Sequence, residues 1–129
     1  MIERLWIAIA GLSGAIAVGA EAAARHLLAQ QPYRLDLAAT GGRYGLVHAV
    51  ALLVTAALAA NASPGSGHRW LIVSGWCFTA GLVLFCGSLY LLALGAPPVL
   101  ARATPVGGLA FIAGWLALAF AALAPRPAR

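Results

Sequence analysis

Four long apolar segments, separated by short polar connectors, constrain this chain more than any other feature of its sequence. They cover residues 5–24, 44–60, 70–94 and 104–124. Each has or approaches the roughly 20 residues that a helix needs to cross the hydrocarbon core of a bilayer. They show little alternation of apolar and polar residues, and a membrane β-barrel would need more and shorter strands. We therefore expect an all-α fold, an integral membrane four-helix bundle that forms a single transmembrane domain over residues 1–129.

The composition argues against soluble alternatives. Of the 129 residues, 63% are hydrophobic and 9% are charged, against roughly 25% charged residues in ordinary soluble domains. A soluble domain of this size cannot bury so much apolar surface, and disordered chains are polar and charged. The net charge of +5 comes from single arginines at segment ends. Such scattered arginines do not form a phosphate-tracking stripe, so we expect the lipid bilayer as a partner and no nucleic acid.

The connectors suggest how the chain is placed in the membrane. In the first connector, Pro32 should end any helical extension of the first span, and nearby apolar residues favour a short interfacial segment between spans 1 and 2. Four spans put both termini on one side. The arginines are nearly balanced between the two sides of the membrane, with Arg126 and Arg129 on the side of the termini. The N-terminal amine and His68 add positive charge to that side and therefore favour cytoplasmic termini. The arginine- and alanine-rich usage points to a bacterium, so we expect a multi-pass protein of the inner (cytoplasmic) membrane.

Small residues recur near a period of 3.5 in several spans, a spacing that lets helices approach closely in lipid. These stripes are expected to face inward, although in so small a bundle some can also face another protein. Thr104 is expected to be the N-cap of the fourth span, with Pro105 at its first helical position. The residues expected at helix contacts are Gly14, Gly81, Ser88, Tyr90, Thr104, Pro105, Gly107, Gly108 and Gly114.

Polar side chains near one membrane surface are the candidates for function, because ionisable residues within membrane spans are uncommon and often functional. Glu21 and Arg25 are four residues apart, so they can pair on one helix face. The cluster fits either a proton or ligand site or a hydrogen-bond network that fixes helix register. Its members are Glu21, Arg25, His26, Arg43, Tyr44 and His48.

Further chemistry is not indicated by the sequence. Cys77 and Cys86 are nine residues apart, on opposite faces of a helix, and are expected to be packing residues. No cysteine or second carboxylate joins His26 and His48 at metal-ligand spacing. A catalytic Ser-His-Asp set, a phosphate-binding loop and a haem-binding histidine pair are also not visible. We therefore expect no enzymatic activity, no metal and no cofactor.

The third and fourth segments carry two motifs that resemble a known family. Residues 85–94 read FCGSLYLLAL, and TPVGG at residues 104–108 precedes Gly114-Trp115. With Tyr44 and His48 four residues apart, the chain resembles the YgdD-like, or transmembrane-protein-256-like, family of small four-span membrane proteins, a domain of unknown function. The resemblance implies the fold and no biochemical activity. The family pattern Gly-Ala-x-Gly-Ala-His differs here, since residues 21–26 read EAAARH, which removes close-packing sites and adds an acid–base pair.

Three functions remain open at this point. The first is a non-catalytic accessory or structural subunit that packs against a larger inner-membrane complex, respiratory or photosynthetic, with other membrane-protein subunits as partners. The alternative is a small homo-oligomeric transporter or channel whose polar path uses Glu21, Arg25 and His48. The third is an enzyme or lipid-binding module at the interface that uses His26, Asp36 and His48. We favour the first, because the small-residue bundle carries no catalytic set.

Overall fold

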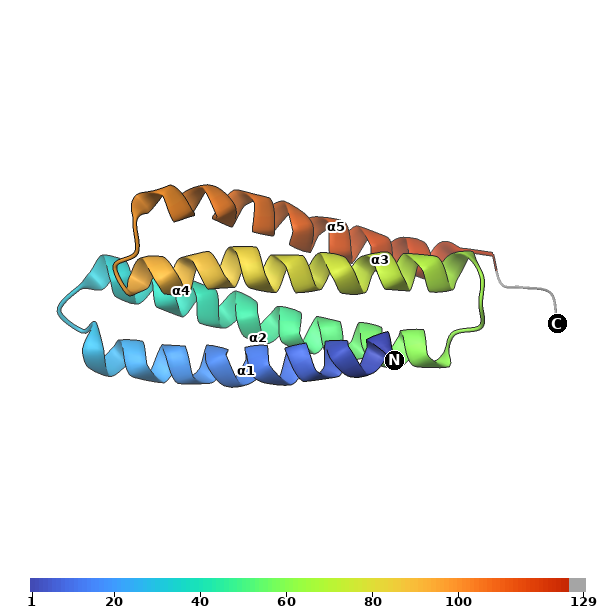
Figure 1. Ribbon diagram of the computed structural model, residues 1–129, viewed down its shortest axis with the longest axis horizontal. Coiled ribbons are helices and arrows are strands. Elements are labelled where there is room, and N and C mark those ends of the chain that lie inside the picture. The colour runs from blue at the N-terminus through green and yellow to red at the C-terminus, as the bar shows by residue number, and fades with distance from the viewer. Residues whose placement is uncertain (126–129) are drawn as a thin grey trace.

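The structure, a computed structural model, describes residues 1–125, so Arg126 and Arg129 lie outside the described residues. Four helices are long and apolar enough to cross a membrane, namely residues 2–27, 32–61, 66–93 and 98–123. The expected all-α, four-span fold is confirmed (Figure 1). In chain order the elements are α1 (Ile2–Leu27), α2 (Pro32–Asn61), α3 (Ser66–Gly81), the π-helix η1 (Leu82–Cys86), α4 (Gly87–Ala93), the 3-10 helix η2 (Pro98–Arg102) and α5 (Ala103–Leu123).

The first connector is shorter than expected. It spans only residues 28–31, because α2 begins at Pro32, whose fixed φ and missing N–H suit a first helical position. Residues 32–43 are therefore the first three turns of α2, and the expected separate interfacial segment is not formed. The reason lies in packing. Ala38 is buried with Ala24 of α1 and Ala93 of α4, which holds this stretch against two other helices.

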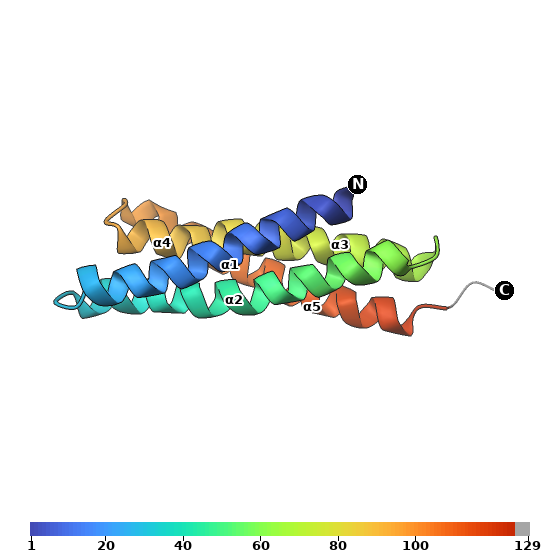
Figure 2. The same cartoon turned by 90° about the horizontal axis from the view of Figure 1, so that it is seen from below.

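The helices are arranged as two antiparallel pairs (Figures 1 and 2). α1 packs along α2, α5 packs along α3 and η1, and α2 also contacts α3, η1 and α4. α2 is consequently the central helix. Of its most apolar window 44% is buried inside the protein, against 17% for α1. The N-terminus and the end of α5 lie at the same end of the bundle, as four spans require.

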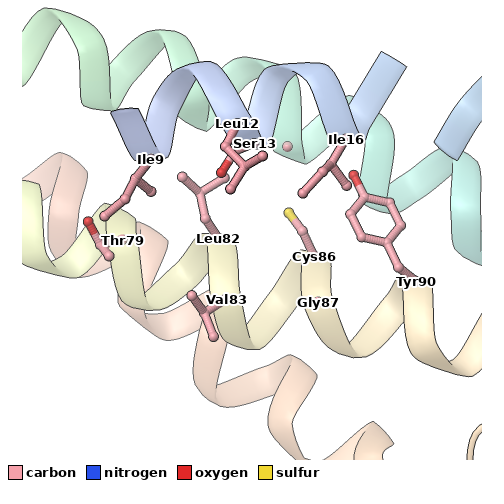
Figure 3. A pocket seen from close by; sticks show the side chains of 11 residues that line it. Ile9, Leu12, Ser13, Ile16, Thr79, Leu82, Val83, Cys86, Gly87 and Tyr90 are labelled. Atoms are coloured by element: carbon pink, nitrogen blue, oxygen red, sulfur yellow. The ribbon is translucent and has the colours of Figure 1, made fainter. Parts of the chain in front are cut away.

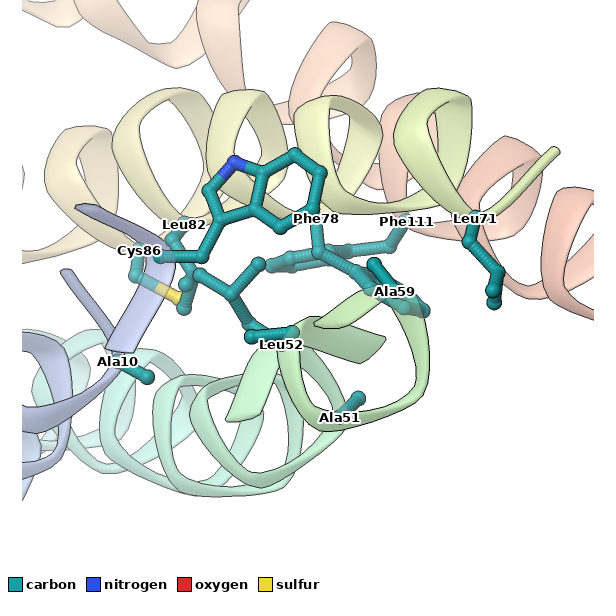
Figure 4. Packing of buried hydrophobic residues seen from close by; sticks show 11 residues of the cluster. Ala10, Ala51, Leu52, Ala59, Leu71, Phe78, Leu82, Cys86 and Phe111 are labelled. Atoms are coloured by element: carbon teal, nitrogen blue, oxygen red, sulfur yellow. The ribbon is translucent and has the colours of Figure 1, made fainter. Parts of the chain in front are cut away.

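Large side chains fill the core around the middle of α3 (Figure 4). Trp6, Leu52 and Phe78 are fully buried, and they come from α1, α2 and α3 respectively. The Trp6 ring lies directly over Gly75, where an added Cβ would come within 2.5 Å of the ring. Glycine at this position therefore makes room for the largest side chain of the core.

Three expected packing glycines hold α5 close to the third span. A Cβ on Gly81 would overlap the ring of Phe111, and a Cβ on Gly114 would lie 2.7 Å from the ring of Phe78. A Cβ on Gly107 would overlap the backbone of Phe85. Close approach of backbones across small residues is the usual way in which membrane helices associate.

A serine hydroxyl adds a hydrogen bond to this contact. The Ser74 hydroxyl donates to the carbonyl oxygen of Gly114 over 2.9 Å and is fully buried. This hydrogen bond directly joins α3 and α5.

Two other glycines that we expected at helix contacts behave differently. No atom lies within 4 Å of a Cβ added to Gly14, because α1 packs through the face that carries Trp6, Ala10 and Ala17. The expectation that Gly14 lies at a helix contact is therefore wrong within this chain. A Cβ added to Gly108 would lie 3.7 Å from the ring of Phe85, which is an ordinary van der Waals distance, so this contact does not require glycine.

The start of the fourth span also differs from expectation. Thr104 is not the N-cap, because α5 begins at Ala103 and continues directly from η2. Its hydroxyl lies 2.7 Å from the hydroxyl of Ser88, which joins α4 to α5. Pro105 is exposed in the first turn of α5 and not at its first position. Its missing N–H is harmless there, since the first N–H groups of a helix have no intrahelical partner.

Candidate functional site

His48 lies at the centre of a group of aromatic side chains between α2, α3 and α5. It is 5% exposed. Its ring stacks on Phe111, with centroids 3.5 Å apart and planes at 13°. The rings of Phe78 and Trp115 lie 5.8 and 6.1 Å away, and Tyr44 stacks parallel to His48 at 6.0 Å. This aromatic cluster consists of Tyr44, His48, Phe78, Phe111 and Trp115.

Both ring nitrogens of His48 have partners, and these partners define its tautomer. Nδ1 lies 2.8 Å from the carbonyl oxygen of Tyr44, which can only accept, so Nδ1 carries the hydrogen. Nε2 accepts a hydrogen bond of 3.2 Å from the indole Nε1 of Trp115. The ring is therefore neutral in this arrangement, and a second proton on Nε2 would break the bond to Trp115. The arrangement couples α2 to α5 through side chains.

Glu21 and Arg25 form a separate ion pair on α1. The expected pairing is present, with Arg25 Nη2 2.8 Å from Glu21 Oε1. The Glu21 side chain is 29% exposed and the Arg25 side chain is 68% exposed. Glu21 lies beside α2 at Gly42, where an added Cβ would be 3.5 Å from the Cβ of Glu21.

The expected polar cluster is thus divided by α2 into two groups. Tyr44 and His48 belong to the aromatic cluster, whereas Glu21 and Arg25 lie on the α1 side. His26 and Arg43 are exposed and form no hydrogen bond or ion pair with the residues that the structure describes. The sequence predicted that these six residues lie near one membrane surface, and for His48 this is wrong. Because α2 begins at Pro32, His48 is the seventeenth of its 30 residues and lies near the middle of the span. The sequence also did not show which face of α2 each residue occupies.

Tyr90 closes the space between α1, α2 and α4. A Cβ on Gly41 would lie 2.7 Å from its ring, and a Cβ on Gly45 would lie 3.0 Å from its hydroxyl oxygen. The hydroxyl is buried and has no hydrogen-bond partner within residues 1–125. Tyr90 is thus at a helix contact, but that contact depends on two glycines of α2 that the small-residue stripes did not include.

The remaining reactive side chains are dispersed. Cys77 and Cys86 are free thiols, and Cys86 is buried. Among the described residues, no three His, Cys, Asp or Glu side chains come together in a group that could hold a metal ion. The most organised polar feature is therefore the aromatic cluster around His48, whose contacts join α2 to α3 and α5.

Comparison with known proteins identifies the family of this chain. Residues 20–108 match the family model described as a protein of unknown function (DUF423). The chain is 37% identical to the UPF0382 membrane protein YwdK of Bacillus subtilis, over 93% of this chain and 97% of that protein. It is 34% identical to a UPF0382 membrane protein of Haemophilus influenzae, over 92% of this chain and 94% of that protein.

A third relative agrees with the resemblance seen in the motifs. The chain is 35% identical to the UPF0382 inner membrane protein YgdD of Escherichia coli, over 89% of this chain and 86% of that protein. No solved structure matches. With the four apolar helices, these matches establish a small multi-pass membrane protein, and the chain belongs to the DUF423 family of UPF0382, YgdD-like membrane proteins.

Proposed function

We propose that this protein is a non-catalytic accessory subunit that packs against a larger respiratory or photosynthetic complex in the bacterial inner membrane. The observation that carries the proposal is an open apolar groove of about 680 Å³ along the outer faces of α1 and α2. Glycine and alanine residues of α1 form one side of it, and larger aliphatic residues of α2 form the other. The lining residues are Ile7, Ala10, Gly11, Gly14, Ala15, Val18, Leu46, Ala49, Val50 and Leu53.

The two glycines of this groove, Gly11 and Gly14, are not used for packing inside the chain. No atom lies within 4 Å of a Cβ added to Gly11 or to Gly14. In a membrane, where lipid tails are as apolar as leucine, helices associate through close packing over such small residues. A transmembrane helix of another subunit can therefore approach α1 more closely here than over a surface of leucines.

The transporter alternative finds less support in the same geometry. Its polar path requires Glu21, Arg25 and His48 to share one space. His48 is instead enclosed by aromatic rings on one side of α2, and the ion pair lies on the other side. The accessory role, without enzymatic activity and with both termini in the cytoplasm, is therefore the function that we propose.

Native electrophoresis with mass spectrometry tests the accessory role on membranes solubilised in a mild detergent. We expect the wild-type protein to migrate with a large complex. Gly14→Leu should reduce that comigration, because it fills the groove. Gly19→Leu is the matched control, since Gly19 is on the same helix, has no atom within 4 Å of an added Cβ, and does not line the groove.

Migration of the wild-type protein only as a monomer or a small homo-oligomer would contradict the accessory role. An equal effect of the two leucine variants would contradict the assignment of the groove. Reporter fusions at each terminus test the orientation, and a periplasmic signal from both fusions would reverse it.

A further inference from the structure

A second groove runs along the opposite side of α1, facing η1 and α4 (Figure 3). Its first lobe has a volume of about 350 Å³ and lies between Ile9 and Leu12 of α1 and Leu82 of η1. Its second lobe has a volume of about 270 Å³ and is lined by Ala20 and Ala38, among other apolar residues. Ile16 and Tyr90 line both lobes, so the two lobes adjoin along α1 at these side chains.

The groove exists because α1 packs along α2 over its length, whereas its contact with α3 is made by Trp6 near its N-terminal end. Its second lobe carries alanine and leucine side chains from α1, α2 and α4, and Tyr90 is the sole lining side chain there with a polar atom. Since α1 and α4 belong to membrane-spanning helices, this long apolar surface opens toward the lipid.

A cationic side chain lies next to residues that line the second lobe. Arg34 lies one turn before Ala38 on the same face of α2, at the end of the span. Its guanidinium packs on Gly95, with Nη2 3.0 Å from the position of a Cβ added there. Gly95 directly follows Leu94, which lines the lobe. Arg34 forms no ion pair with any residue from 1 to 125, so its charge is available to a ligand.

We propose that this groove binds one acyl chain of an anionic phospholipid, with the lipid phosphate at Arg34. Charge complementarity is what identifies the occupant. Apolar lobes along α1 with a guanidinium beside the second one fit a molecule with a long hydrocarbon chain and an anionic head. A basic side chain near an anionic lipid surface contributes about 1 kcal/mol of attraction. The site is on the other side of α1 from the groove assigned to a partner subunit, so the two proposals stand independently.

Native mass spectrometry of the purified full chain tests the proposal, with phosphatidylglycerol or phosphatidylcholine of equal chain length added to the detergent. We expect the wild-type protein to retain one phosphatidylglycerol in preference to phosphatidylcholine. Arg34→Gln should weaken the retention of phosphatidylglycerol about fivefold, the effect of one basic contact at a lipid surface, and should remove the preference. Arg43→Gln is the charge-matched control, because Arg43 is exposed in the same half of α2 and does not line either lobe.

A pair of alanine variants tests the apolar part of the site. Ala20→Phe fills the second lobe and should reduce the retention of both lipids, whereas Ala22→Phe, at an exposed position outside the groove, should leave it unchanged. Inorganic phosphate alone should not compete, because it offers no chain to the groove.

Four results would overturn the proposal. The first two are equal losses of lipid retention in Arg34→Gln and Arg43→Gln, and equal losses of lipid retention in the two phenylalanine variants. The third is displacement of the lipid by inorganic phosphate. The fourth is a lipid-free dimer that Ala20→Phe dissociates. The last result would assign the groove to a second copy of the chain.

Discussion

Two adjacent glycines of α5 should respond very differently to the same substitution. A Cβ on Gly107 would overlap the backbone nitrogen of Phe85 and lie 2.8 Å from its Cα. Backbone atoms cannot rotate away as a side chain can, so α5 and η1 would have to separate. A Cβ on Gly108 would lie 3.7 Å from the ring of Phe85, which is an ordinary contact distance.

The size of the difference follows from known effects of overpacking. Extra methyl groups in a well-packed core destabilise by about 1–3 kcal/mol. We therefore expect Gly107→Ala to lower the free energy of unfolding by about 1–3 kcal/mol. Gly108→Ala removes a flexible residue from a helix without a clash, and we expect it to be neutral or to stabilise by up to about 1 kcal/mol. The substitution and its effect on helix propensity are the same at both sites, so the difference reports the clash.

Equilibrium unfolding of the purified protein measures this difference, in mixed micelles of a mild detergent and dodecyl sulfate with far-ultraviolet circular dichroism as the signal. Gly14→Ala provides a second control, because an added Cβ there meets no atom within 4 Å. Equal stability of the Gly107→Ala and Gly108→Ala proteins would show that α5 does not approach η1 as closely as described, and would refute the reasoning.

Three further predictions can be tested with the same unfolding measurement. Ser74→Ala removes the buried hydrogen bond to Gly114 and should lower the free energy of unfolding by about 0.6 kcal/mol, and by no more than about 1.7 kcal/mol, as found for hydrogen bonds between membrane helices. An unchanged unfolding midpoint would contradict this prediction. Trp115→Phe keeps an aromatic ring but removes the donor to His48, so a loss of about 0.5–1.5 kcal/mol is expected, and a more stable variant would argue against that hydrogen bond. Glu21→Gln breaks an ion pair whose arginine is mostly exposed and should change stability by less than about 0.5 kcal/mol, with a larger loss indicating a buried role for the carboxylate.

The four spans could be predicted from the sequence because length and apolar composition alone decide whether a helix can cross a membrane. The small-residue spacing also predicted that Gly81, Gly107 and Gly114 lie at helix contacts, although it did not identify the rings and backbone that they meet. The same spacing did not distinguish Gly14, since it does not show which face of α1 is turned toward α2. A stripe of small residues indicates that a helix can be approached, but it does not identify the neighbour.

The partners of His48 could not be predicted, because they depend on tertiary structure. Trp115 lies 67 positions further along the chain, and no local pattern links the two. Helix periodicity also could not separate His48 from Glu21, because the sequence did not show that α2 begins at Pro32, which places His48 near the middle of the span. Their separation by α2 depends on the rotation of that helix about its axis, which is set by contacts such as Tyr90 against Gly41 and Gly45.

The π-helix η1 has a consequence for how this family can vary in length. A short π-helix is equivalent to one extra residue inserted into an α-helix, with the flanking turns kept in their original orientation. Deleting one residue there should restore a regular α-helix while Phe78 and Tyr90 keep their present directions. Val83, which is 64% exposed, is the residue whose removal loses the least contact. A similar deletion within α5 would turn every later side chain by about 100°, so we expect a one-residue length difference to be tolerated in η1 and not in α5.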